Sequence, residues 1–133
     1  MNQSTEAKGL RYNDGKPEMS YILEARHALH GLAKVLELGA KKYSRGNWRK
    51  GLSHTSIVDS MTRHLTAYMS GENNDPETGL PHVDHVLCNA LFLSEMTRTY
   101  PELDDREGPQ NVVCEKPMTA KEWQAKWDSG AGR

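Results

Sequence analysis

The sequence predicts an all-α fold, and three observations lead to that prediction. Long segments carry apolar residues three or four positions apart, which places those residues on one face of a helix. No stretch alternates apolar and polar residues within a β-rich run. Turn and cap residues separate the helical segments. We therefore expect about three main helices over residues 20–99 and a short C-terminal helix.

Bulk composition bounds the organisation of the chain. Its 133 residues are enough for one domain, expected over residues 1–100 and followed by a polar tail over 101–133. The 17 basic and 18 acidic residues balance, which argues against binding to extended nucleic acid or to a membrane surface. The N-terminus has no apolar run and the two cysteines form no disulfide framework, so a cytoplasmic protein is expected. The hydrophobic share of 36% predicts a homo-oligomer, either a dimer or a tetramer.

A charged turn precedes the first helix. Asn13, Asp14 and Gly15 have turn chemistry, and the following Lys16-Pro17 step discourages helix. This segment is either a solvated surface turn or a strap that lays Arg11 and Lys16 against an anion.

The first helix is predicted from Ser20, as its N-cap, to Tyr43. Its apolar stripe consists of Ile22, Ala25, Leu29, Leu32, Leu36 and Tyr43. The opposite stripe is polar and includes Glu24, His27, His30 and Glu37. Such a stripe is usually the solvated side of an amphipathic helix. The alternative is that its two histidines and two glutamates contribute to a pocket.

Cations and aromatic residues alternate where this helix ends. The cations are Lys41, Lys42, Arg45, Arg49 and Lys50, and they are interleaved with Tyr43 and Trp48. The helix macrodipole accounts for Lys41 and Lys42, but it does not account for Asn47-Trp48. Cations beside aromatic faces suit a stacked base with a charged phosphate tail. The ring of Trp48 is expected to bury itself against a ligand, a partner or the edge of the core.

Two further helices and the turn between them concentrate the polar residues. One helix is predicted from about Ser53 to Ser70, and its core side consists of Ile57, Met61, Leu65 and Tyr68. The other runs from His82 to about Thr99, with Pro81 in its first turn. His82, His85 and Asn89 share one face, which Phe92 and Met96 extend. These polar residues either cap and pack the helices or form a pocket together with Arg63 and His64.

Glu72 and Asp75 lie in the turn between these two helices, and two roles are open for them. They either bind a divalent cation or serve as turn and cap residues.

The C-terminal region predicts one short helix, from about Thr119 to Asp128. Trp123 and Trp127 lie one turn apart on it. We expect this pair to pack on the domain or across an oligomer interface.

Four motifs, in order along residues 9–98, carry a family resemblance: GLRYNDGKP, GAKKY with NW, RHL, and GE..D…GLPH..H…N. Together they resemble the N-terminal domain family of phage dATP/dGTP diphosphohydrolases, which is similar to the MazG-like all-α nucleoside triphosphate pyrophosphatases. The resemblance implies a MazG-like helical bundle. It also implies metal-dependent hydrolysis of a purine deoxynucleoside triphosphate, dGTP or dATP, to the monophosphate and pyrophosphate. The implied setting is phage nucleotide metabolism in the host cytoplasm.

Residue roles follow from the chemistry that such a reaction needs. Mg²⁺ or Mn²⁺ requires hard oxygen ligands, so Glu72 and Asp75 are the leading metal ligands. These two residues and His82 are the predicted catalytic residues. His82 or His85 is either a further ligand, which favours Mn²⁺, or a donor to phosphate.

Substrate binding is assigned to a larger set of residues. Its cations neutralise the triphosphate. Tyr43 or Trp48 stacks on the purine, and Asn47 or Asn89 hydrogen bonds to the edge of the base. The set comprises Arg11, Lys16, Lys41, Lys42, Tyr43, Asn47, Trp48, Arg63, His64, His85 and Asn89.

The chain departs from the wider MazG-like pattern in its acidic residues. That pattern has a helical E-E-x-x-E motif followed by E-x-x-D on the next helix. Here E-x-x-D is Glu72 to Asp75 in a turn, and His27 and His30 stand where acidic residues are expected. Two other classes therefore stay open: a nucleotide-binding protein without turnover that sequesters a nucleotide, and a structural or interaction module whose histidines and tryptophans pack.

Overall fold

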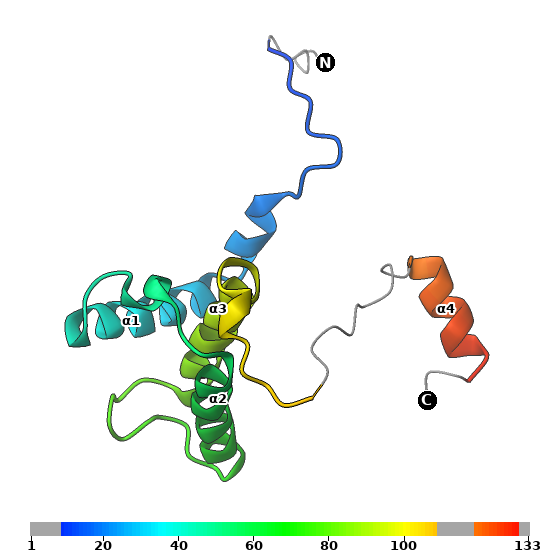
Figure 1. Ribbon diagram of the computed structural model, residues 1–133. Coiled ribbons are helices and arrows are strands. Elements are labelled where there is room, and N and C mark those ends of the chain that lie inside the picture. Colours follow the sequence, from blue (N-terminus) through cyan, green and yellow to red (C-terminus); the bar gives the residue numbers. More distant parts are fainter. Residues whose placement is uncertain (1–8, 109–118, 131–133) are drawn as a thin grey trace.

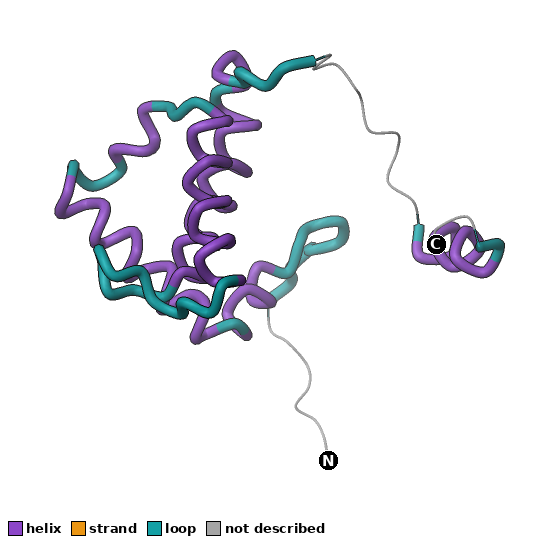
Figure 2. Tube along the Cα trace, turned by 90° about the horizontal axis from the view of Figure 1, so that it is seen from below, coloured by secondary structure: helices purple, strands orange, loops and turns teal. Residues whose placement is uncertain are grey.

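The computed structural model describes residues 9–108 and 119–130, and within these ranges the chain forms helices and no strand (Figure 2). The only extended pairing in the described part is an isolated bridge between Asn74 and Pro81. The all-α prediction is confirmed. The elements in order are η2 (Met19–Glu24), α1 (Arg26–Lys42), η3 (Asn47–Lys50), α2 (His54–Met69), α3 (His82–Thr99), η4 (Pro101–Leu103) and α4 (Ala120–Asp128).

Helices α2 and α3 form an antiparallel pair, and α1 packs across α3 (Figure 1). The start of α2 meets the end of α3, where His54 Nε2 lies 3.1 Å from the carbonyl oxygen of Tyr100. The end of α2 meets the start of α3, where His64 contacts His82. The loop over residues 70–81 therefore closes a helical hairpin and lies at the same end as the histidines.

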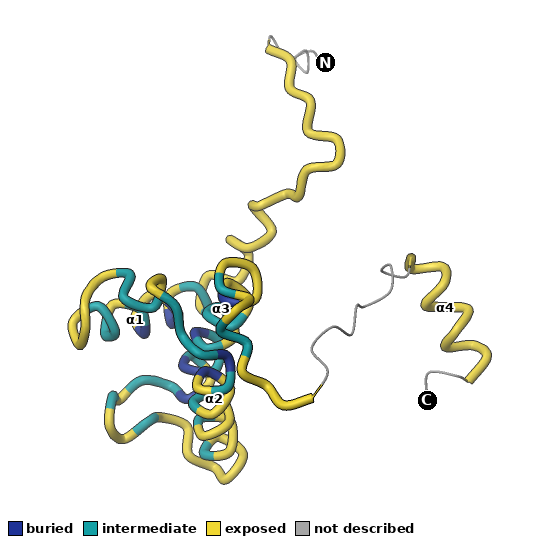
Figure 3. Tube along the Cα trace, in the orientation of Figure 1, coloured by how far each residue is buried: buried dark blue, intermediate teal, exposed yellow. Residues whose placement is uncertain are grey.

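The core is small, and its main cluster lies where α1 crosses α3, with Leu32 and Val35 on α1 and Cys88 on α3 (Figure 3). Its buried apolar residues are Leu32, Val35, Ile57, Cys88 and Met96. Gly31 of α1 is also buried, and a side chain there would collide with the carboxylate of Asp84 on α3. The absence of a side chain at Gly31 lets α1 approach the first turn of α3 closely.

The prediction of one continuous first helix was wrong. Residues 19–24 form the 3-10 helix η2, and the backbone breaks at Ala25 (φ −93°, ψ 56°) before α1 begins. Ser20 lies inside η2 and is not an N-cap. No residue of η2 is buried, and Ile22 is 50% exposed. Because short helices in water depend on tertiary packing, the unpacked first turns do not continue the α-helix.

Within α1 the predicted apolar stripe is partly right. Leu32 is buried, whereas Tyr43 is 65% exposed and lies beyond the helix end. Val35, which the predicted stripe omitted, is buried instead. The core therefore uses only the middle of α1, where it crosses α3.

The predictions for the next two helices were closer. Helix α2 begins after Ser53, whose hydroxyl accepts a hydrogen bond from the Ser56 amide, as an N-cap residue does. Its predicted core side holds for Ile57 but is wrong for Leu65 and Tyr68, which are 47% and 42% exposed. Helix α3 has the predicted bounds, and Met96 on its predicted inner face is 1% exposed.

Residues 100–106 return to the start of α2 and tie the two ends of the helical pair together. Asp105 accepts two hydrogen bonds from Thr55, at 3.0 Å from its amide and 2.7 Å from its hydroxyl. Asp104 Oδ1 lies 3.7 Å from Nδ1 of the buried His54. Hydrogen bonds from Thr55 lower the pKa of Asp105 to about 2.

The predicted C-terminal helix is present as α4, which begins with a capping box formed by Thr119 and Glu122. Trp123 and Trp127 are 53% and 50% exposed within the single chain. The homo-oligomer that these rings suggested stays a prediction. Among the described residues, no helix has the length and apolar character needed to cross a bilayer.

Candidate functional site

An open cleft of about 1510 Å³ lies between the C-terminal half of α1 with its following loop and the histidine-bearing ends of α2 and α3. Ten of the predicted site residues line it: Lys41, Lys42, Tyr43, Asn47, Trp48, Arg63, His64, Asp75, His82 and His85. Segments that are distant in sequence are therefore brought to one concave surface, as in most ligand sites.

One side of the cleft is basic. Lys41, Lys42, Arg45 and Arg49 line that side, on α1 and the segment that follows it. With Arg63 of α2, the whole cleft has five cations against three acidic residues, Glu37, Asp75 and Glu77. Lys42 places its ammonium 5.5 Å from the centre of the exposed Tyr43 ring. Trp48 stacks on Phe92 of α3 with ring centres 4.8 Å apart, so its ring is half-buried against the edge of the core while it still lines the cleft. Tyr43 is the more exposed of the two predicted stacking rings, at 65%.

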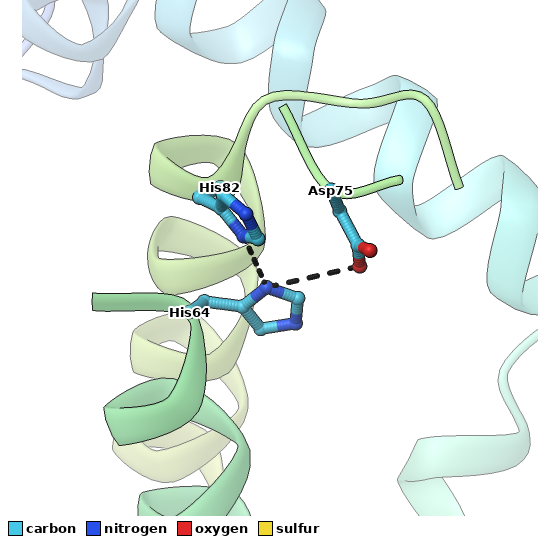
Figure 4. Close-up of side chains that lie close together, drawn as sticks. All are labelled: His64, Asp75 and His82. Carbon is cyan, nitrogen blue, oxygen red and sulfur yellow. Dashed lines mark hydrogen bonds and ion pairs between the residues drawn. The ribbon is translucent and has the colours of Figure 1, made fainter. Parts of the chain in front are cut away.

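A histidine–carboxylate cluster forms the opposite side. His64 of α2, Asp75 of the 70–81 loop and His82 of α3 point toward one another (Figure 4). His64 Nδ1 lies 2.9 Å from His82 Nδ1 and 3.9 Å from Asp75 Oδ2. One ligand atom from each residue lies within 4.8 Å of the other two. This cluster can hold a divalent cation.

Glu72 fixes the orientation of His82 from behind. Its Oε1 lies 2.7 Å from His82 Nε2, and because a carboxylate oxygen accepts, Nε2 carries the proton and donates it. The side chain of Glu72 is 48% exposed, whereas that of His82 is 5% exposed. The Nδ1 atom of His82 is consequently turned toward His64 and Asp75.

The loop backbone fixes Asp75 in the same way. Its Oδ1 accepts a hydrogen bond of 2.9 Å from the amide of Glu77, which is the chemistry of an Asx turn. Its main-chain N–H donates to the Leu80 carbonyl at 2.8 Å. Its second oxygen, Oδ2, is thereby presented to His64 and to His85, at 3.9 Å from each ring.

His85 supports the cluster from one turn further along α3. Its ring stacks on that of His64, with centres 4.3 Å apart and planes within 4° of parallel. Burial lowers the pKa of both His64 and His85, although Asp75 acts in the opposite direction. Both imidazoles are therefore uncharged near pH 7, which is the form that binds metals.

The neighbouring thiol of Cys88 is not a nucleophile. Burial raises its pKa to about 12, so it remains protonated at neutral pH. Its position in the core cluster with Leu32 and Val35 accounts for it.

Four predicted site residues do not line the cleft. Arg11 and Lys16 are exposed on the segment before η2, which extends away from the helices in Figure 1. Glu72 contacts His82 from outside the cleft. Asn89 donates to Ser60 Oγ and to the His85 carbonyl oxygen, and so bridges α2 and α3. Arg11, Lys16 and Asn89 therefore lie outside the cleft, and their roles in ligand binding stay predictions.

His64, predicted to bind substrate, lies beside Asp75 and His82, a position that its sequence context alone does not give. A signal was present, because His64 follows Ile57 by seven residues and Met61 by three, which puts it on the apolar face of α2. Thr78 was missed entirely, and its hydroxyl lies 2.8 Å from His85 Nε2. Among the described residues, the polar stripe predicted for the first helix, with Glu24, His27, His30 and Glu37, forms no metal-binding group. The one candidate group in the described part of the chain is His64, Asp75 and His82.

Fold and cleft together define an all-α protein whose histidine–carboxylate cluster faces a basic surface suited to a phosphorylated ligand. The chain belongs to the family described as dATP/dGTP diphosphohydrolase, N-terminal, which it matches over residues 6–106. It is 32% identical over 98 residues to a dATP/dGTP diphosphohydrolase of Salmonella phage PMBT28. That match covers 74% of this chain but 33% of the relative, so the chain spans about a third of the relative's length. No solved structure matches the chain.

Proposed function

We propose that the chain binds a purine deoxynucleoside triphosphate, dGTP or dATP, in the cleft and hydrolyses it to the monophosphate and pyrophosphate. The phage relative's name supports the substrate class. The single observation that carries the proposal is the pairing of a histidine–carboxylate cluster with five cations across one cleft. The proposed setting is nucleotide metabolism in the cytoplasm of a phage-infected cell.

In this proposal the basic side of the cleft holds the triphosphate. Lys41 and Lys42 approach it from the end of α1, and Arg63 approaches from α2, where its guanidinium can bind phosphate oxygens in pairs. The exposed Tyr43 ring stacks on the base, and Asn47 hydrogen bonds to its edge. Trp48, already stacked on Phe92, supports the loop that carries Asn47.

The cluster serves the reacting phosphate. A bound divalent cation would supply positive charge at the phosphate oxygens and an activated water. The water oxygen bonds to the α-phosphorus, the bond from that phosphorus to the bridging oxygen breaks, and the water's proton passes to solvent. Both ring nitrogens of His82 are engaged, by Glu72 and His64, so its role is to hold the site rather than to transfer this proton.

The test is direct measurement of products. Purified chain is incubated with dGTP, dATP or dCTP and with Mn²⁺ or Mg²⁺, and pyrophosphate and monophosphate are quantified. We expect equal amounts of the two products from a purine substrate. Lys41→Ala and Lys42→Ala should each raise KM by about 10-fold, from the loss of a charge-assisted contact. Lys34→Ala is the matched control, since Lys34 is exposed on the same helix outside the cleft.

A second candidate, nucleotide binding without turnover, is favoured by the acidic residues that α1 lacks, since His27 and His30 stand where the MazG-like pattern has glutamates. A true ligand raises the melting temperature by mass action, whether or not it is hydrolysed. Stabilisation by dGTP or dATP together with no pyrophosphate release would favour this candidate over the enzyme. No stabilisation by any nucleotide would reject both.

A further inference from the structure

We propose that His64, Asp75 and His82 bind a first-row transition-metal ion, such as Mn²⁺, Fe²⁺, Co²⁺ or Zn²⁺, in preference to Mg²⁺. Glu72 then acts as a positioning residue behind His82 and is not a ligand. This inference deepens the proposed function by naming the ion and its ligands. Its test requires no nucleotide, so the two proposals can fail separately.

The spacing of the three side chains suits one ion. Two ligands at about 2.1 Å from a tetrahedral ion are about 3.4 Å apart. The distance from His64 Nδ1 to His82 Nδ1 is 2.9 Å and that to Asp75 Oδ2 is 3.9 Å, on either side of this value. Small rotations of the side chains about positions that the fold already sets therefore bring them to ligand distance.

The chemistry of the donors selects the class of ion. Two imidazole nitrogens and one carboxylate oxygen suit transition metals, and this combination recurs in non-haem iron sites and catalytic zinc sites. Mg²⁺ prefers oxygen ligands in octahedral geometry and retains much of its water. The oxygen ligand that this cluster offers is Oδ2 of Asp75, because Oδ1 is hydrogen bonded to the Glu77 amide.

Glu72 has the position of an outer-sphere residue, one that hydrogen bonds to a metal ligand without binding the metal itself. A metal-bound histidine usually donates its second ring N–H to a carboxylate, which fixes the tautomer and the plane of the ring. His82 donates Nε2–H to Glu72 at 2.7 Å, and this leaves the lone pair of Nδ1 for the ion. His64 would bind the ion through Nδ1 as the tautomer that carries its proton on Nε2, so both histidines would coordinate as neutral rings.

The remaining coordination positions face the proposed substrate. All three ligands line the cleft, whereas Glu72 does not. Three protein ligands leave at least one position open, as in catalytic sites and unlike closed structural sites. Arg63 lines the same cleft one residue before His64, so a phosphate that reaches the ion also meets a guanidinium.

The first experiment measures metal binding by the full chain after treatment with a chelator. Co²⁺ titration is followed by visible absorption, and Mn²⁺ and Mg²⁺ are titrated calorimetrically. We expect one Co²⁺ or Mn²⁺ per chain and no competition from millimolar Mg²⁺. Asp75→Asn, which preserves side-chain volume, and His64→Ala should each weaken binding by more than about 100-fold, beyond the loss expected for an outer-sphere change. His30→Ala, at an exposed position on α1, is the matched control.

The second experiment separates the role of Glu72 from that of a ligand. Glu72→Gln retains an oxygen that accepts from His82 Nε2, so binding should stay within a few fold of the wild type. Glu72→Ala removes the acceptor and should weaken binding by about 10–100-fold. Circular dichroism and melting temperature confirm folding of each variant. Equal Mg²⁺ affinity, unchanged binding in Asp75→Asn, or equal losses in the two Glu72 variants would overturn the proposal.

Discussion

Gly31 sets how closely α1 approaches α3, and its substitution gives a stability prediction with an internal control. A Cβ atom at Gly31 would lie 2.5 Å from Asp84 Cγ and 2.7 Å from its Oδ1. Gly39 lies in the same helix, and a Cβ there would meet nothing within 4 Å. Each Gly→Ala change gains about 1 kcal/mol in helix propensity, so that gain cancels when the two variants are compared.

The comparison isolates the cost of the collision. Forcing a methyl group into a packed contact costs about 1–3 kcal/mol, and the cost here lies at the low end because the colliding atoms are the end of the Asp84 side chain, which can turn aside. Gly31→Ala should therefore unfold at a free energy about 1 kcal/mol below that of Gly39→Ala, which should itself exceed the wild type by about 1 kcal/mol. Because Lys41 and Lys42 lie near the end of the same helix, an outward shift of α1 would also widen the cleft.

Urea denaturation followed by circular dichroism provides the measurement. Introducing Asp84→Ala removes the colliding carboxylate, so Gly31→Ala should then stabilise the chain about as much as Gly39→Ala does. Equal stability of Gly31→Ala and Gly39→Ala in the wild-type background would refute the reasoning. So would a deficit that persists unchanged without the Asp84 side chain.

Two further predictions concern the core and the segment over residues 100–106. Met96→Ala should destabilise the chain by about 2–5 kcal/mol, because Met96 is 1% exposed. Met69→Ala, at a 75% exposed site, should change the free energy of unfolding little. Chemical denaturation measures both variants, and equal losses of stability would contradict the core assignment. Asp105 has its pKa lowered to about 2 in the folded chain by hydrogen bonds from Thr55, so its contribution is present above its ordinary pKa and is lost as pH falls toward 2. The melting temperature of the wild type should thus fall more steeply between pH 4 and 2 than that of Asp105→Asn, and parallel profiles would contradict this.

Much of the helical architecture follows from local sequence. Helix α3 has the predicted bounds because Pro81 suits a helix start and apolar residues recur at helical spacing up to Met96. Ser53 and Thr119 cap α2 and α4 through contacts with residues only three positions away. Capping contacts and apolar spacing involve residues only a few positions apart, so the helices that depend on them could be predicted from the sequence.

The sequence likewise indicated the chemistry of the site but not its geometry. The spacing of His82 and His85 predicted that they share one helical face, because residues three apart on a helix are neighbours. The sequence could not place His64 2.9 Å from His82 across 18 residues, nor turn Glu72 away from the cleft while Asp75 faces it. Those positions depend on how the 70–81 loop folds against two helices.

The sequence by itself determined which segments are helical, where most helices begin, and which polar residues gather near the start of α3. Only the tertiary structure decided that the first helix breaks at Ala25, that Trp48 stacks on Phe92, and that the histidine cluster faces a basic cleft. Helix starts and faces are set by contacts within a few residues. The break, the stacking and the cleft depend instead on burial between segments far apart in the chain, and no local pattern encodes that burial.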